Sequence, residues 1–117
     1  MTTDSTHAMI ASDRVEGTDV YSTSGDKLGS IDHLMIDKVS GQVRSAVLEF
    51  GGFLGMGEER YPLPWSMLTY DTDKEGYVVP IDKARLEGAP RYNRDERPDW
   101  DPAYDRSVNT YYGVPMI

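Results

Sequence analysis

An acidic run has the residue spacing in this chain that comes closest to a known chemistry. Asp71, Asp73 and Glu75 alternate as carboxylates do at the start of a calcium-binding loop, and Asp82 falls at the twelfth position. Such a loop lies between two helices, whereas the residues on both sides predict strands and Pro80 lies inside the run. We therefore interpret the run as an acidic hairpin turn, and we retain a small-molecule or cation site there as an alternative.

The histidine inside the patterned part of the chain, His33, has carboxylates close by at Asp32 and Asp37. A catalytic triad also needs a nucleophile within reach of its base, and the nearest candidate, Ser30, is expected on a different face. We interpret His33 as a structural residue at an irregular point of a strand. No catalytic residue, metal ligand set or cofactor site is predicted, and the absence of cysteine excludes thiolate metal sites and disulfides.

A glycine-rich stretch at residues 51–57 resembles a phosphate-binding loop only superficially. It lacks a following helix and a Lys-Ser/Thr pair, and Glu58 and Glu59 repel phosphate. The stretch is typical of a hairpin loop. If it has a role, its three large apolar residues suit a partner surface or a dimer contact: Phe53, Leu54 and Met56.

Composition narrows the possible classes of partner. The chain has 117 residues, with 20 acidic and 12 basic side chains and a net charge of −8. This charge disfavours nonspecific binding to nucleic acid or to anionic lipid. No segment reaches the roughly 20 apolar residues that cross a bilayer, and the first 13 residues lack the apolar stretch of a secretory signal. We expect a soluble, cytoplasmic protein without direct nucleic-acid contact or membrane insertion.

The elements that position these residues are short strands. Apolar and polar residues alternate between Val20 and Val79, and a glycine-containing turn interrupts them about every ten residues. The expected strands are 20–21, 28–37, 42–50, 58–63, 67–70 and 77–81. In the second strand the apolar residues change parity, which predicts a bulge near Gly29 or Asp32-His33. The pattern predicts an all-β domain of six short strands that forms a small sandwich or barrel, and the bulge favours closure into a small antiparallel β-barrel.

Two helical segments are expected after the strands. Asp82 is suited to cap a single helical turn with Leu86 facing inward and Gly88 ending it. Near the C-terminus, Asp101 is suited to cap a helix with Pro102 at its first position, and this helix ends at Gly113. We expect a flexible arm at 1–14, the barrel at 15–88 and an extended tail at 89–117 that ends in the short helix.

The third strand and the tail both carry apolar side chains that a small barrel leaves uncovered. Val43 and Val47 share the face opposite to Ala46 and Leu48, and this second face is less polar than an exposed surface should be. The tail is rich in aromatic residues, unlike a disordered tail. It is therefore expected to dock on the barrel or on a second subunit. Its candidate anchors are Trp100, Tyr104, Tyr111 and Tyr112.

Several of these segments resemble the PRC-barrel domain. The matching residues are Val20-Tyr21, Ser24-Gly25-Asp26-Lys27-Leu28-Gly29, Ile31, Ile36-Asp37, Ser40-Gly41, Val47-Leu48, Phe50 and Tyr61-Pro62-Leu63-Pro64-Trp65. The resemblance covers about residues 15–86 and implies a six-stranded barrel that acts as an interaction module without catalytic residues. Such domains occur in the photosynthetic reaction-centre H subunit, in ribosome maturation factors and as stand-alone proteins, and this chain is most similar to the stand-alone type.

The expected function is a non-catalytic, homodimeric adaptor that binds a protein partner. One alternative is a ribosome-assembly factor that binds a basic ribosomal protein. The other is the small-molecule or cation-binding domain noted above. The partner-binding residues predicted for the adaptor are Val43, Val47, Phe53, Leu54, Met56, Trp100, Tyr104, Tyr111 and Tyr112.

Overall fold

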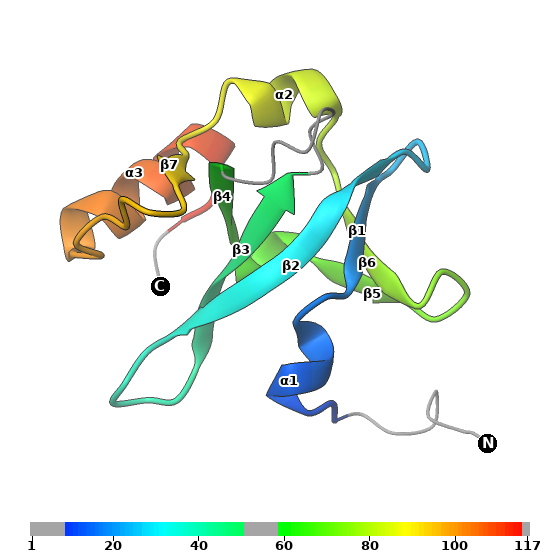
Figure 1. Cartoon of the computed structure of the whole chain (residues 1–117), viewed down its shortest axis with the longest axis horizontal. Coiled ribbons are helices and arrows are strands. Elements are labelled where there is room, and N and C mark those ends of the chain that lie inside the picture. Colours follow the sequence, from blue (N-terminus) through cyan, green and yellow to red (C-terminus); the bar gives the residue numbers. More distant parts are fainter. Residues whose placement is uncertain (1–8, 51–58, 116–117) are drawn as a thin grey trace.

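The computed structural model describes residues 9–50 and 59–115, which form a seven-stranded sheet with short helices around it (Figure 1). The strands are β1 (Asp19–Ser22), β2 (Lys27–Ile36), β3 (Val43–Phe50), β4 (Glu59–Pro64), β5 (Thr69–Asp71), β6 (Gly76–Val79) and β7 (Tyr92–Asn93). The helices are α1 (Ser12–Val15), α2 (Lys83–Glu87) and α3 (Pro102–Tyr112), with a short 3₁₀ helix η2 (Trp65–Met67). None of the described helices is long and apolar enough to span a membrane.

The prediction of a closed, six-stranded antiparallel barrel was wrong in its strand count and in its closure. The strand order is β5-β6-β1-β2-β3-β4-β7, so β5 and β7 are the two ends of an open sheet. β1 and β6 pair in parallel, and all other neighbouring strands pair antiparallel. The physical reason is that β7, which belongs to the tail, occupies the outer edge of β4. The sheet-dominated fold itself is confirmed.

The predicted irregularity of the second strand is confirmed at both expected places. The pairing of β1 with β2 skips Leu28, and the pairing of β2 with β3 skips Asp32. These shifts let Leu28 and Ile31 both point into the core, although they differ in parity, and each is 1% exposed. Ile36, beyond a third shift, is half exposed.

The sheet curves around a single main core. Directly opposed residues of neighbouring antiparallel strands share a face. Ile31 pairs with Leu48, and Ala46 pairs with Leu63, and all four are buried in this core. The buried members of the core are Val15, Val20, Leu28, Ile31, Ala46, Leu48, Tyr61, Leu63, Tyr77, Val79, Leu86 and Ala89. Val15 enters the core from α1, a short helix that the sequence reading did not predict.

Both predicted helix signatures are confirmed. The Asp82 carboxylate accepts a hydrogen bond from the backbone N–H of Arg85 at 2.8 Å, and Asp101 accepts one from Tyr104 N–H at 2.8 Å. Each of these bonds satisfies a backbone donor that has no partner within its helix. Gly113 ends α3 in the left-handed conformation, with φ of +71°, which glycine adopts without steric cost.

Candidate functional site

The tail covers the outer face of β3 and β4, on the opposite side from the main core. Val47 pairs with Pro62, and both are fully buried without belonging to the core. Arg60, the next residue of β4 on this face, pairs with Tyr92 of β7. Helix α3 packs against β4 (Figure 1). Its Val108 is fully buried. The apolar second face of β3 is therefore covered within the same chain.

Aromatic rings connect the two tail elements. Tyr92 contacts Trp100 edge to face with ring centroids 6.4 Å apart, and Trp100 contacts Tyr104 of α3 at 4.9 Å. The indole N–H of Trp100 lies 3.4 Å from a carboxylate oxygen of Asp105, whose other oxygen pairs with Arg44 of β3 at 3.2 Å. These contacts connect the start of α3 to the sheet.

The C-terminal end of α3 packs on α2 and on the rim of the main core. The Tyr111 hydroxyl donates to the Arg85 carbonyl at 2.6 Å, and the Arg85 guanidinium lies 4.3 Å from the Tyr111 ring centroid and donates to the Tyr111 carbonyl. Tyr111 and Tyr112 both pack against the core. The tail is thus held at both ends.

A polar cluster lies on the tail-covered face. Nδ1 of His33 donates to Asp32 at 2.7 Å, and Nε of the buried Arg60 lies 3.5 Å from the same carboxylate oxygen. Partial burial favours the neutral form of Asp32, but the His33 hydrogen bond and the Arg60 charge outweigh it and lower its pKa below the usual value. The cluster keeps a charge pair satisfied beneath the tail.

This cluster resembles a catalytic triad in composition but not in geometry. His33 pairs with Val47, and Ser45 pairs with Pro64. Val47 and Pro64 both lie on the outer face of β3 and β4, so Ser45 and His33 share this face. The Ser45 hydroxyl and Nε2 of His33 are both buried without a hydrogen-bond partner among the described residues, so they do not bond to each other. Ser45 is also fully buried, so a substrate has no access to it. The structure therefore favours the structural interpretation of His33.

Two tyrosines of α3, Tyr104 and Tyr112, also have buried hydroxyl groups. Neither hydroxyl has a hydrogen-bond partner within residues 9–50 and 59–115. Burial raises the pKa of Tyr104 to about 12 and raises that of Tyr112 further above the usual range for tyrosine. Both side chains are therefore neutral at physiological pH.

The acidic run Asp71–Gly76 forms the hairpin turn between β5 and β6, as interpreted. One carboxylate oxygen of Asp71 accepts from the backbone N–H groups of Asp73 and Lys74, at 2.9 and 3.2 Å. This arrangement is a local turn motif of aspartate. In the described ranges no three His, Asp or Glu side chains are grouped closely enough to hold a metal ion.

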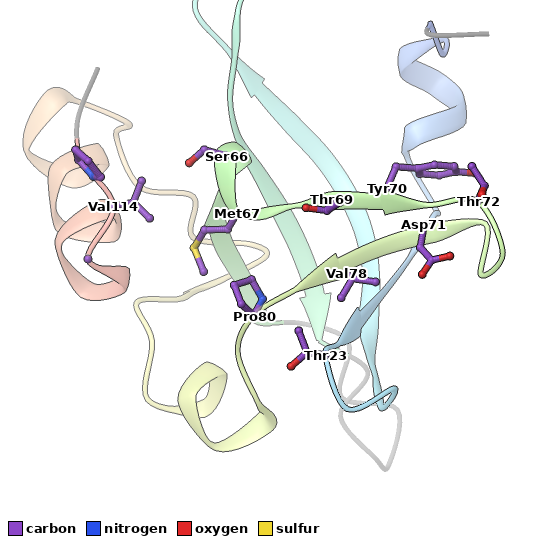
Figure 2. A pocket seen from close by; sticks show the side chains of 12 residues that line it. Thr23, Ser66, Met67, Thr69, Tyr70, Asp71, Thr72, Val78, Pro80 and Val114 are labelled. Carbon is purple, nitrogen blue, oxygen red and sulfur yellow. The ribbon is translucent and has the colours of Figure 1, made fainter. Parts of the chain in front are cut away.

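A second surface, which we call the β5 groove, lies beside this hairpin (Figure 2). It has a volume of about 890 Å³ and opens to solvent. Its lining includes Thr23, Met67, Thr69, Asp71, Val78 and Val114. Thr69 pairs with Val78, whereas Tyr70 pairs with Tyr77 of the core, so the groove floor is the outer face of β5 and β6.

The predicted partner-binding residues fall into three groups. Val47 is fully buried under the tail, while Val43, Trp100, Tyr104, Tyr111 and Tyr112 are partly exposed. Phe53, Leu54 and Met56 lie outside the described residues. Sequence reasoning missed the β5 groove, because its residues come from four separate segments. The short strand predicted at 67–70 was the signal available for it.

Among solved structures, the chain is similar to a putative 16S ribosomal RNA processing protein, RimM, from Pseudomonas aeruginosa, with a TM-score of 0.46 and 19% identity. The match covers 71% of this chain and 50% of that chain, so this chain matches about half of that protein's length. A search of curated proteins found no match. The family model of the PRC-barrel domain matches residues 7–86, well over half of the sequence, and the chain therefore belongs to the PRC-barrel domain family.

Proposed function

We propose that this protein is a non-catalytic protein-binding module that binds its partner in the β5 groove, beside the part of the sheet that its own tail covers. The observation that carries the proposal is the contrast between the two outer surfaces. The tail covers β3 and β4, whereas the outer face of β5 and β6 forms a groove that is open to solvent and that the tail only borders, with residues 113–115. A groove with apolar and hydroxyl side chains beside an uncovered strand suits a protein surface.

The shape of the groove favours a protein over a small molecule. Small-molecule sites enclose most of their ligand's surface, in cavities of roughly 300–1,000 Å³. The β5 groove has a comparable volume, about 890 Å³, but is open along one side. The polar groups nearest to a catalytic arrangement, Asp32 and His33, lie under the tail on the other part of the sheet. Both features support binding without catalysis.

A site-specific cross-link tests this proposal. We would replace Thr69, in the groove, with the photo-cross-linking residue p-benzoylphenylalanine, and Asp95, whose side chain is 78% exposed on the tail, as the control. Irradiation in native lysate is expected to give an adduct of one discrete mass at position 69 and none at position 95. Equal adducts at both positions, or none at position 69, would contradict a partner site in the groove.

Homodimer formation is part of the proposal. Because α3 and β7 dock on their own chain, the contact between subunits must involve other apolar side chains. Ile36 and Val39 on the β2–β3 hairpin and Met9 and Ile10 before α1 are large and at least half exposed. Light scattering on the purified chain is expected to give twice the mass of one chain. A monomer at all concentrations would remove this part of the proposal.

A ribosome-assembly role is a special case in which the partner is a basic ribosomal protein. The net charge of −8 favours such a partner over RNA itself. Salt-sensitive co-sedimentation with ribosomal subunits is the measurement that separates this role from a general adaptor.

A further inference from the structure

The β5 groove extends along the free edge of the sheet. Residues 69–72 are four consecutive positions, and all of them line it. Three of them, 69–71, form β5, whose side chains point alternately to its two faces, so a groove that all three border reaches the strand's edge as well as its outer face. Figure 2 shows Tyr70 and Thr72 on one side of β5 and Asp71 on the other. The groove therefore gives access to the backbone of β5.

That backbone has no neighbour on its outer side. β5 is the last strand of the order, and among the described residues it pairs only with β6. In a strand with one neighbour, about half of the N–H and C=O groups point outward and are free to pair with another chain. An extended peptide that lies in the groove is in position to form these hydrogen bonds as an additional strand.

The charges around this edge favour a basic peptide. Asp71 lines the groove, and Asp73 and Glu75 are exposed in the turn that follows. The cation in the same turn, Lys74, lies 5.2 Å from the ring centroid of Tyr21. A second copy of this chain that paired with β5 through its own β5 would bring a second set of these carboxylates to the contact, which disfavours self-association at this edge.

We propose that the β5 groove binds an extended, lysine- or arginine-bearing segment of a partner protein, which pairs with the free edge of β5. This inference rests on the proposed protein-binding function and identifies the partner's chemistry and the mode of binding. Alternate side chains of the segment lie beside Met67 and Thr69 in the groove, and its cations lie near Asp71. Backbone hydrogen bonds supply sequence-independent affinity, and the alternate side chains supply selectivity.

The test uses the full chain and two synthetic peptides of about eight residues, one alternating valine with lysine and the other alternating valine with glutamate. Binding is followed by amide chemical shifts in NMR and by hydrogen exchange. The lysine peptide is expected to shift the amides of 69–72, Thr23 and Val78 and to protect amides of β5 from exchange. The glutamate peptide is expected not to bind at concentrations up to about 1 mM.

Two charge-neutralising variants locate the electrostatic contribution. Asp71→Asn retains the oxygen that accepts from the backbone of the turn but removes the charge, and it is expected to weaken binding about two- to fivefold at low salt. Asp95→Asn removes one charge from the exposed tail and is expected to leave the affinity unchanged. Equal weakening by both variants would show attraction to net charge only and would overturn the site.

The remaining outcomes also decide the question. Shifts confined to the tail, absence of β5 protection, equal binding of both peptides or no binding at about 1 mM would each overturn the inference. Self-association through β5, seen as concentration-dependent protection without peptide, would also overturn it. If the cross-link at position 69 still captured one partner in any of these cases, the protein-binding function would stand and only the basic strand would be rejected.

Discussion

At the scale of single residues, two tyrosines of α3 differ in whether the hydroxyl group is hydrogen-bonded. The Tyr111 hydroxyl donates to the Arg85 carbonyl at 2.6 Å, whereas the buried Tyr104 hydroxyl has no partner in the described ranges. Tyr111→Phe is expected to lower the free energy of unfolding by about 1 kcal/mol, and Tyr104→Phe to leave it unchanged or raise it. Urea unfolding at pH 7 measures both, and an equal cost for the two variants would show that the Tyr104 hydroxyl is satisfied.

The carboxylate of Asp32 predicts a dependence on acidic pH. Because the folded state lowers its pKa below the usual value of about 3.9, Asp32 contributes stability above that pH and loses it as the pH falls through the folded-state pKa. Asp32→Asn is therefore expected to be destabilising at pH 7, and its difference from the unmodified chain should shrink below about pH 4. Urea unfolding across this range measures it, with the exposed Asp95→Asn as the control. A constant difference would contradict the role assigned to His33 and Arg60 in lowering this pKa.

At the scale of elements, β2 and β3 leave no room for a side chain at Gly29. A Cβ on this residue would lie 2.2 Å from the backbone oxygen of Glu49, which has no room to move within the paired sheet. Gly29→Ala is expected to cost about 3 kcal/mol or more, or to prevent folding. Ser30→Ala, one position along the same strand, is expected to stay within about 0.5 kcal/mol. Thermal and urea unfolding measure both, and a stable, unchanged Gly29→Ala protein would show that the strands separate easily here.

Elements with local signals could be predicted from the sequence, and those formed by distant contacts could not. The caps at Asp82 and Asp101 and the terminating Gly113 each depend on residues a few positions apart, and they were predicted correctly. β7 has only two residues and exists because Tyr92 meets Arg60 of β4, so no alternation marks it. The same pairing leaves the sheet open. The Asp32–His33–Arg60 cluster and the β5 groove were missed for the same reason, because separate strands build them.

At the scale of the whole molecule, the tail acts as a second layer over part of the sheet. Without residues 89–117, Val47 and Pro62 lose the cover of β7 and α3, and the main core loses Tyr111 and Tyr112 from its rim. Exposing even one such side chain costs about 1.5–3 kcal/mol, which in a domain of this size lowers the melting temperature by on the order of 10 °C. We therefore expect a chain that ends at Gly88 to have a lower melting temperature than the full chain.

The measurement compares melting curves and elution volumes of the full and shortened chains. Val108→Asp, which places a charge at a fully buried position of α3, is expected to reproduce the loss in the full chain by undocking the helix. Asp95→Asn, on the exposed part of the tail, is expected to melt as the unmodified chain does. If the shortened chain kept both its melting curve and its elution volume, the outer face of β3 and β4 would not need the tail. The contrast between a covered and an uncovered surface, on which the proposed function depends, would then be lost.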